Sequence, residues 1–247
     1  MILFNVCYRI LKRQIYKKTI LELGMCFSVE ASFVTSAVLI PVGIACLKES
    51  LSNNKSYWAF ALLPFLFGVQ QLLEAVVWLT VDEQQASLLW SATFVFLFFS
   101  HFLWLFWIPF SSFLTETNNI KRKLFFVVTI LGLLFGGSMY IPLLLEPDWV
   151  AVSIQQYSIY YDVRLVYDAI LPRYASTMIY AVIILVPLLL SSDRYHKVLG
   201  VLVTISGLLT WVFFGLVFIS VWCFFAALIS SYIFYQVVLT KHKLPSN

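Results

Sequence analysis

The fold is decided by the run VLGVLVTISGLLTWVFFGLVFISVWCFFAALISSYIFYQVVL, residues 198–239, which contains no charged side chain. As a single α-helix its 42 residues would measure about 60 Å, twice the thickness of the hydrocarbon core of a bilayer. Two membrane-spanning helices joined by a tight turn near Gly215 are therefore expected.

The whole chain has the composition of an integral membrane protein. Of its 247 residues, 62% are hydrophobic and 11% are charged, whereas about 25% of the residues in a soluble domain are charged. Because about 20 apolar residues cross a bilayer, we expect an all-α polytopic bundle of seven transmembrane helices, with the lipid bilayer as its partner. The expected spans are residues 27–47, 57–80, 88–111, 123–144, 174–192, 197–216 and 218–239.

Basic residues gather in alternate loops. The loops after the second, fourth and sixth expected spans carry only Arg164 and Arg173, together with several acidic residues. Since cytoplasmic loops are rich in Lys and Arg, the C-terminus is expected in the cytoplasm, and the net charge of +4 does not indicate nucleic-acid binding. The basic residues on the expected cytoplasmic side are Lys48, Lys55, Lys121, Arg122, Lys123, Arg194, Lys197, Lys241 and Lys243.

The first 24 residues conflict with this orientation. Residues 1–24 carry five basic side chains, which resist export to the outer face. Three explanations stay open: a basic amphipathic helix on the membrane surface, a targeting segment, or a start placed upstream of the natural one. The chain is accordingly divided into this extension, a seven-helix domain at 25–240 and a cytoplasmic tail at 241–247.

The longest loop, residues 145–172, is expected to face outward. Its middle is rich in β-branched and aromatic residues around the polar pair Gln155-Gln156, and Pro147 and Pro172 bracket it. Such a pattern fits a short β-hairpin. An irregular loop with interfacial aromatic residues is the alternative.

Ionisable residues within the expected spans need partners in the bundle interior, because lipid solvates them poorly. Glu74 lies on one helix face with Gln70, Gln71 and Trp78, at the i, i+3, i+4 spacing. Glu30 and Cys223 are expected at a similar depth, which predicts a polar pocket between the first, second and last spans. Hydrogen bonding between helices without a ligand is the alternative. The candidate ligand-binding residues are Gln70, Gln71, Glu74, Trp78, His101, Trp222 and Cys223.

Histidines are assigned by their depth. His101 is expected near mid-membrane, with Gln70 at a comparable depth as a candidate partner, and acts either in packing or in proton transfer. His196 and His242 fall in expected cytoplasmic loops and are predicted to lie on the surface.

Four segments carry a resemblance to a known family. MCFSVEASF (25–33), FGVQQLLEAVVW (67–78), PLLLSS (187–192) and SVWCFFAALIS (220–230) resemble a family of uncharacterised bacterial multi-pass membrane proteins whose chains typically begin MCFS. Ala75 departs from the pattern, which more often has Gly there. The resemblance implies a seven-span protein of the bacterial inner membrane without an established activity, and it favours Met25 as the natural start.

Two chemistries are compatible with these residues, besides a purely structural role. If Met25 were removed, Cys26 would become an N-terminal nucleophile, with Glu30 and Glu74 in proton transfer. Alternatively, Cys26, Glu30, Glu74 and Cys223 offer thiolate and carboxylate ligands for zinc or copper, although their spacing is no recognised metal motif. The sequence indicates no particular cofactor.

Overall fold

The computed structural model describes residues 28–81, 86–155 and 158–239. In this part of the chain, seven helical segments are long and apolar enough to cross a membrane, which confirms the predicted all-α fold. Single helices form four of them: α2 (Val29–Asn53), α7 (Asn119–Leu145), α8 (Arg173–Leu190) and α9 (Arg194–Phe214). The other three spans each consist of consecutive helical pieces. The second contains η1 (Lys55–Tyr57), α3 (Trp58–Ala61) and α4 (Leu63–Thr80), and the third contains α5 (Ala86–Phe98), η2 (Phe99–Leu103) and α6 (Trp104–Thr115). The last contains α10 (Phe218–Phe234) and η6 (Tyr235–Leu239).

Helix boundaries follow local sequence signals. The apolar run 198–239 breaks at a short 3-10 turn, η5 (Gly215–Val217), as predicted. Ser28, Asn118 and Asp193 cap α2, α7 and α9, each with a side-chain oxygen that accepts a backbone N–H of the first turn.

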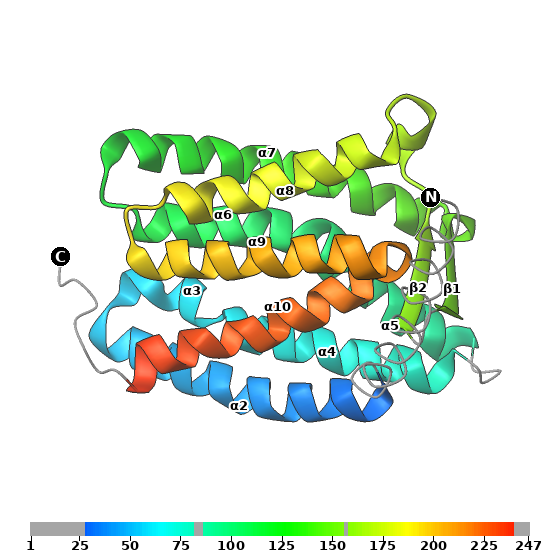
Figure 1. The fold of residues 1–247 in the computed structure, drawn as a ribbon, viewed down its shortest axis with the longest axis horizontal. Coiled ribbons are helices and arrows are strands. Elements are labelled where there is room, and N and C mark those ends of the chain that lie inside the picture. Colours follow the sequence, from blue (N-terminus) through cyan, green and yellow to red (C-terminus); the bar gives the residue numbers. More distant parts are fainter. Residues whose placement is uncertain (1–27, 82–85, 156–157, 240–247) are drawn as a thin grey trace, which may run out of the picture.

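The loop at residues 145–172 contains the predicted β-hairpin. Strands β1 (Val150–Gln155) and β2 (Ser158–Val163) pair in antiparallel register, with Val150 opposite Val163. The hairpin lies across one end of the bundle (Figure 1), which we call the hairpin end. Ile159 and Tyr161 of β2 are buried there, and the Tyr161 ring stacks on Phe96 of α5 at 4.7 Å.

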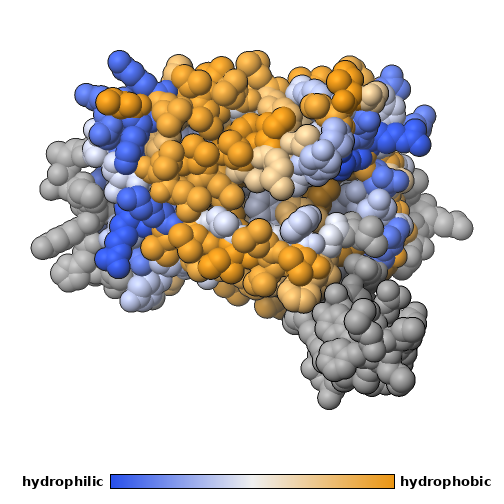
Figure 2. Space-filling model, turned by 45° about the horizontal axis from the view of Figure 1, so that its top comes forward, coloured by the Kyte–Doolittle hydropathy of each residue, from blue (hydrophilic) through white to orange (hydrophobic). Residues whose placement is uncertain are grey.

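The opposite end of the bundle is called the basic end, because α7 and α9 begin there with Lys121, Arg122, Lys123, Arg194 and Lys197. Hydrophobic surface separates the two hydrophilic ends in Figure 2. Large apolar side chains such as Leu134 and Trp211, each 64% exposed, contribute to the hydrophobic surface. Exposed apolar surface of this extent is what a lipid-facing bundle requires, and the chain is a multi-pass membrane protein.

Glycines allow two pairs of helices to pack backbone against backbone. A Cβ atom at Gly43 of α2 would overlap the backbone of Phe65 in α4, and one at Gly132 of α7 would overlap the carbonyl oxygen of Leu105 in α6. Small residues at such contacts are typical of membrane bundles, where close van der Waals packing stabilises helix pairs.

Substitution of Gly132 by Val is therefore expected to destabilise the α6–α7 contact. The added side chain has no room beside the Leu105 backbone, and overpacking of this kind costs about 3 kcal/mol or less when the helices can shift. The thermal unfolding midpoint in detergent should fall by several degrees. Gly137→Ala is the control, because its Cβ would meet Ile141 at an ordinary 3.7 Å; equal effects of the two variants would contradict the close approach.

Candidate functional site

The polar face of α4 points into the bundle. Gln70 and Gln71 are fully buried and Glu74 is 2% exposed. The helical spacing of these three residues places them on one side of an otherwise apolar helix. The predicted inward orientation of this face agrees with their burial.

Glu74 is held by two neutral donors. The Ser220 hydroxyl of α10 donates a hydrogen bond to Glu74 Oε1, and Gln71 Nε2 donates one to Glu74 Oε2 at 2.9 Å. The described residues form two ion pairs, Arg173–Asp168 and His196–Asp193, so no described basic group neutralises the Glu74 carboxylate.

Gln70 joins three helices. Its Nε2 donates to Cys223 Sγ of α10 at 3.2 Å, and its Oε1 accepts the indole N–H of Trp104 of α6 at 2.9 Å. Phe67, one turn earlier on α4, stacks on the Trp104 ring at 4.0 Å. Gln70 thus fixes the contact of α4 with α6 and α10.

His101 lies in the π-helical turn η2, and it is buried. Its Nδ1 is 2.9 Å from Ser100 Oγ, and the Ser100 carbonyl accepts the Tyr180 hydroxyl at 2.7 Å. The expectation that Gln70 is the partner of His101 is wrong, because both ends of the Gln70 amide are used by Cys223 and Trp104. A π-turn frees backbone carbonyls for such outside donors.

Three buried polar atoms near this network have no hydrogen-bond partner among the described residues: Gln71 Oε1, Tyr161 Oη and Trp222 Nε1. Burial raises the pKa of the Tyr161 phenol well above its ordinary value, and the charge of Glu74 raises it further. The Tyr161 side chain packs in the same buried cluster as Cys223. Sequence reasoning missed Tyr161, whose only signal was its place in the expected hairpin.

A cavity of about 40 Å³ begins at Cys223 and Trp222 and continues toward the basic end. Its walls are almost entirely apolar and come from α4, α6, α8, α9 and α10. Residues lining it include Phe67, Trp104, Tyr180, Leu199, Trp222, Cys223, Ala226 and Ser230. A space of this volume holds a water molecule or a few ligand atoms.

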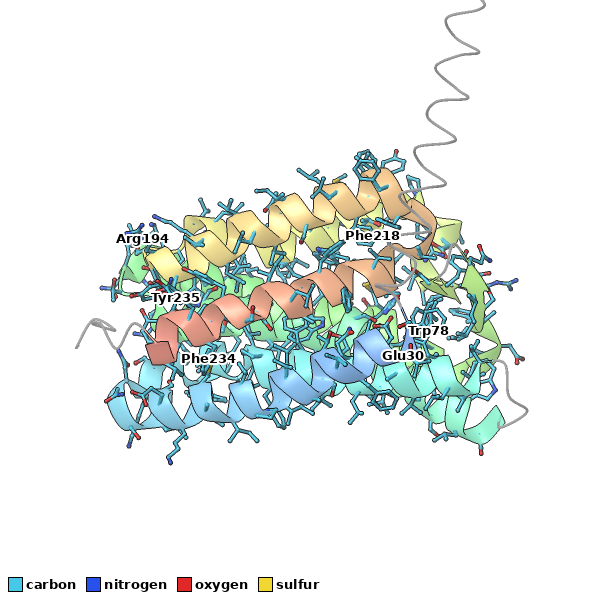
Figure 3. All side chains as sticks on the ribbon, turned by 60° about the horizontal axis from the view of Figure 1, so that its bottom comes forward. Glu30, Trp78, Arg194, Phe218, Phe234 and Tyr235 are labelled. Carbon is cyan, nitrogen blue, oxygen red and sulfur yellow. The ribbon has the colours of Figure 1, made fainter. Side chains whose placement is uncertain are left out.

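The predicted pocket needs correction at the first span. Glu30 is exposed in the first turn of α2 (Figure 3), where a carboxylate is stabilised by the helix N-terminus. Cys26 lies outside the described residues. Trp78 is half-buried and packs against the core near the hairpin end. The polar network is therefore built by the second, third and last spans together with β2.

The described residues do not bring the candidate zinc or copper ligands together. Among the described residues, no three His, Cys, Asp or Glu side chains gather in a way that could hold a metal ion. Glu74 and Cys223 alone fall short of the three or four protein ligands that zinc takes.

A second polar cluster, at the basic end, was missed. His196 is fully buried, so its predicted surface position is wrong. Its Nδ1 is 2.7 Å from Asp193 Oδ2, its Nε2 is 3.4 Å from Thr115 Oγ1, and its ring lies 4.2 Å from that of Phe60. The sequence signal for this pair was the spacing of three residues between Asp193, which caps α9, and His196. His242 lies outside the described residues.

Glu116 ties two loops together at the same end. Its Oε1 accepts the Asn118 N–H at 2.9 Å, and its Oε2 accepts the Ser192 N–H at 2.8 Å. Burial raises the pKa of Glu116, but these backbone hydrogen bonds, the Ser192 hydroxyl and Lys121 lower it more, so the net pKa lies below its ordinary value. The Glu116 and Asp193 carboxylates of this cluster therefore both accept hydrogen bonds within the protein.

The Asp193–His196 pair predicts a pH-dependent contribution to stability. Burial raises the pKa of Asp193, but the hydrogen bond and charge of His196, the Tyr195 N–H and the Tyr57 hydroxyl lower it overall. A lowered folded-state pKa stabilises the protein above the unfolded-state value of about 3.9, and that contribution is lost as the pH falls through the folded-state pKa.

Asp193→Asn keeps the helix cap but removes the charge. We expect it to lower the free energy of unfolding by about 1–2 kcal/mol at pH 7, and the difference from wild type should shrink below about pH 4. Thermal unfolding at the two pH values measures this. An equal deficit at both would show that the charge of Asp193 contributes nothing.

The Gln70–Trp104 hydrogen bond can be tested with a double-mutant cycle. Gln70→Leu leaves the Trp104 N–H buried without its acceptor, whereas Gln70→Leu with Trp104→Phe removes both partners. The double variant should cost less than the sum of the single ones, by about 1 kcal/mol, in a denaturing-detergent titration. Additive costs would contradict the bond.

Comparisons with known proteins give a family without a known activity. No curated protein and no solved structure matches the chain. The model of the family of unknown function DUF6629 matches residues 25–246, which is well over half of the 247 residues. The chain therefore belongs to the DUF6629 family of unknown function.

Proposed function

We propose that this protein binds a small ligand inside the bundle, at the polar network around Glu74, Gln70 and Cys223. We place it in the bacterial inner membrane with its C-terminus in the cytoplasm. The distribution of basic residues supports the orientation, because Lys121, Lys123 and other cations gather at the basic end. The resemblance of the sequence to bacterial membrane proteins supports the location.

The observation that carries the proposal is the set of unpartnered polar atoms beside the network. Gln71 Oε1, Tyr161 Oη and Trp222 Nε1 are buried without a hydrogen-bond partner in the described part of the chain. Each such atom costs about 1–3 kcal/mol. A bound ligand that donates a hydrogen bond to Gln71 Oε1 would remove the cost of that atom.

The adjoining cavity supplies the apolar part of such a site. Aromatic rings of Trp104, Tyr180 and Trp222 line it, and Cys223 belongs both to the cavity wall and to the polar network. Apolar and aromatic walls with a few fixed polar groups are typical of small-molecule sites. Because the cavity is small, the ligand has few atoms or displaces side chains on entry.

The competing functions have less support. Catalysis by Cys26 with Glu30 and Glu74 requires three groups to meet, and Glu30 is exposed. A purely structural network accounts for the satisfied bonds of Gln70. It does not account for the unpartnered Gln71 and Trp222 atoms.

Filling the cavity should abolish ligand retention. Ala226 lines the cavity on α10, so Ala226→Trp places an indole in the space that we assign to the ligand. Native mass spectrometry of wild-type protein, purified in mild detergent, is expected to show an extra non-protein mass, and the variant should lose it. Repeating the purification in a second detergent identifies bound detergent.

Leu228→Trp is the matched control, because Leu228 is on the same helix and 46% exposed. It should retain the extra mass. Ala226→Leu replaces Ala226→Trp if the larger side chain prevents a monodisperse preparation. An extra mass that survives filling of the cavity, or no extra mass on the wild type in either detergent, would refute retention of a ligand that extends into the cavity.

A further inference from the structure

The Glu74 carboxylate is the least compensated charge in the described bundle. It is 2% exposed, and its hydrogen-bond donors, Ser220 and Gln71, are both neutral. The described side chains that pack nearby from the neighbouring elements are also uncharged: Cys223 of α10 and Tyr161 of β2 belong to the same buried cluster as Val77 of α4. A buried carboxylate in a bilayer normally has a cationic partner or a proton.

The oxygen atoms around Glu74 favour one kind of cation. Gln71 donates through Nε2 to Glu74, so its Oε1 belongs to the same amide and is left without a donor. The Tyr161 hydroxyl is also buried without a partner among the described residues, and its side chain packs in the buried cluster that contains Val77 of α4 and Cys223 of α10. Each Glu74 oxygen accepts one hydrogen bond within the protein and keeps a further lone pair.

We propose that Glu74, Gln71 and Tyr161 together bind the protonated amino group of a small primary amine. An ammonium group has three N–H donors and no acceptor. The site offers three oxygens that are able to accept: Glu74, Gln71 Oε1 and Tyr161 Oη. This inference names the ligand class of the site proposed above and rests on that proposal.

The charge of Glu74 and the surroundings of the site fit a primary amine. The ammonium charge neutralises Glu74, and three directional hydrogen bonds replace the water that it loses on entry. Tyr161 belongs to the hairpin that lies across this end of the bundle (Figure 1), whereas the apolar cavity is lined by side chains of the helices. The apolar body of a larger amine would extend past Cys223 into that cavity.

Methylammonium chloride is the probe, tested on the full-length protein in detergent at pH 7 and constant ionic strength. It is expected to raise the thermal unfolding midpoint by about 3 °C at ten times its apparent dissociation constant. Sodium chloride supplies the charge without N–H donors, and tetramethylammonium chloride supplies an alkylated nitrogen without them. Neither salt should produce the shift.

Two variants test named oxygens of the site, and a third is the control. Glu74→Gln should abolish the methylammonium shift, and Tyr161→Phe should weaken the apparent affinity several-fold. Tyr161→Phe removes only a hydroxyl that has no described protein partner, so it remains informative if Glu74→Gln does not fold. Glu146→Gln is the control, because Glu146 is exposed near the hairpin end, and it should respond as wild type does.

The outcomes separate this inference from the proposed function. Equal shifts with all three salts, a shift with sodium alone, or an undiminished shift in Glu74→Gln or Tyr161→Phe would overturn the amine assignment. A retained ligand without a basic nitrogen, lost from Ala226→Trp, would also overturn it while supporting the proposed function. A methylammonium shift that requires Glu74, in a protein that retains no other mass, would support the amine site and refute the cavity as its extension.

Discussion

A carboxylate inside an apolar bundle must find its hydrogen-bond donors within the protein, because the hydrocarbon core of a membrane offers none. Glu74 obtains them from Ser220 of α10 and Gln71 of its own helix. This requirement sets the rotation of α4 about its axis. Gln70, one turn earlier on the same face, then reaches Cys223 of α10 and Trp104 of α6, so the arrangement of three helices depends on one polar face.

Two further features protect that face. The hairpin end is covered by Ile159 and Tyr161 of β2, which are buried, and the Tyr161 ring stacks on Phe96. On the other side, Gly43 lets α2 approach the backbone of α4 without an intervening side chain. The side chains of the network are buried, so their hydrogen bonds form in a medium of low dielectric constant, where they are strong when satisfied and costly when not.

The sequence was sufficient for the fold because each span carries its own signal. A run of apolar residues of known length identifies a helix, Gly215 interrupts the longest run, and β-branched residues in the longest loop indicate the hairpin. The site could be predicted only in part. Depth along a helix placed Glu74 and Cys223 at one level correctly, but it could not say that Glu30 faces outward, because a helix in its first turn is oriented by its neighbours rather than by its own pattern.

His196 was predicted to lie on the surface but is buried, so its environment could not be predicted from local sequence either. Its position near a predicted loop suggested exposure, yet two elements distant in sequence and the cap of its own helix enclose it. The Phe60 ring lies 4.2 Å from its ring, Thr115 lies beside Nε2, and Asp193 accepts at Nδ1. Burial of a residue at the end of a helix depends on how neighbouring loops fold over it. That information is spread over Glu116 and Ser192, which no local pattern connects.

The two polar clusters differ in how completely their polar atoms are paired within the described part of the chain. At the basic end, Asp193 and Glu116 each accept several N–H or O–H donors, and His196 is used at both ring nitrogens. At the hairpin end, Gln71 and Tyr161 beside Glu74 keep polar atoms without described partners. A cluster needed only for stability gains nothing from unpaired buried groups, since each one costs free energy. The unpaired Gln71 and Tyr161 atoms lie in the part of the bundle that also holds the Glu74 carboxylate, which has no cationic partner among the described residues. This combination is the reason for proposing that the cluster exchanges a ligand.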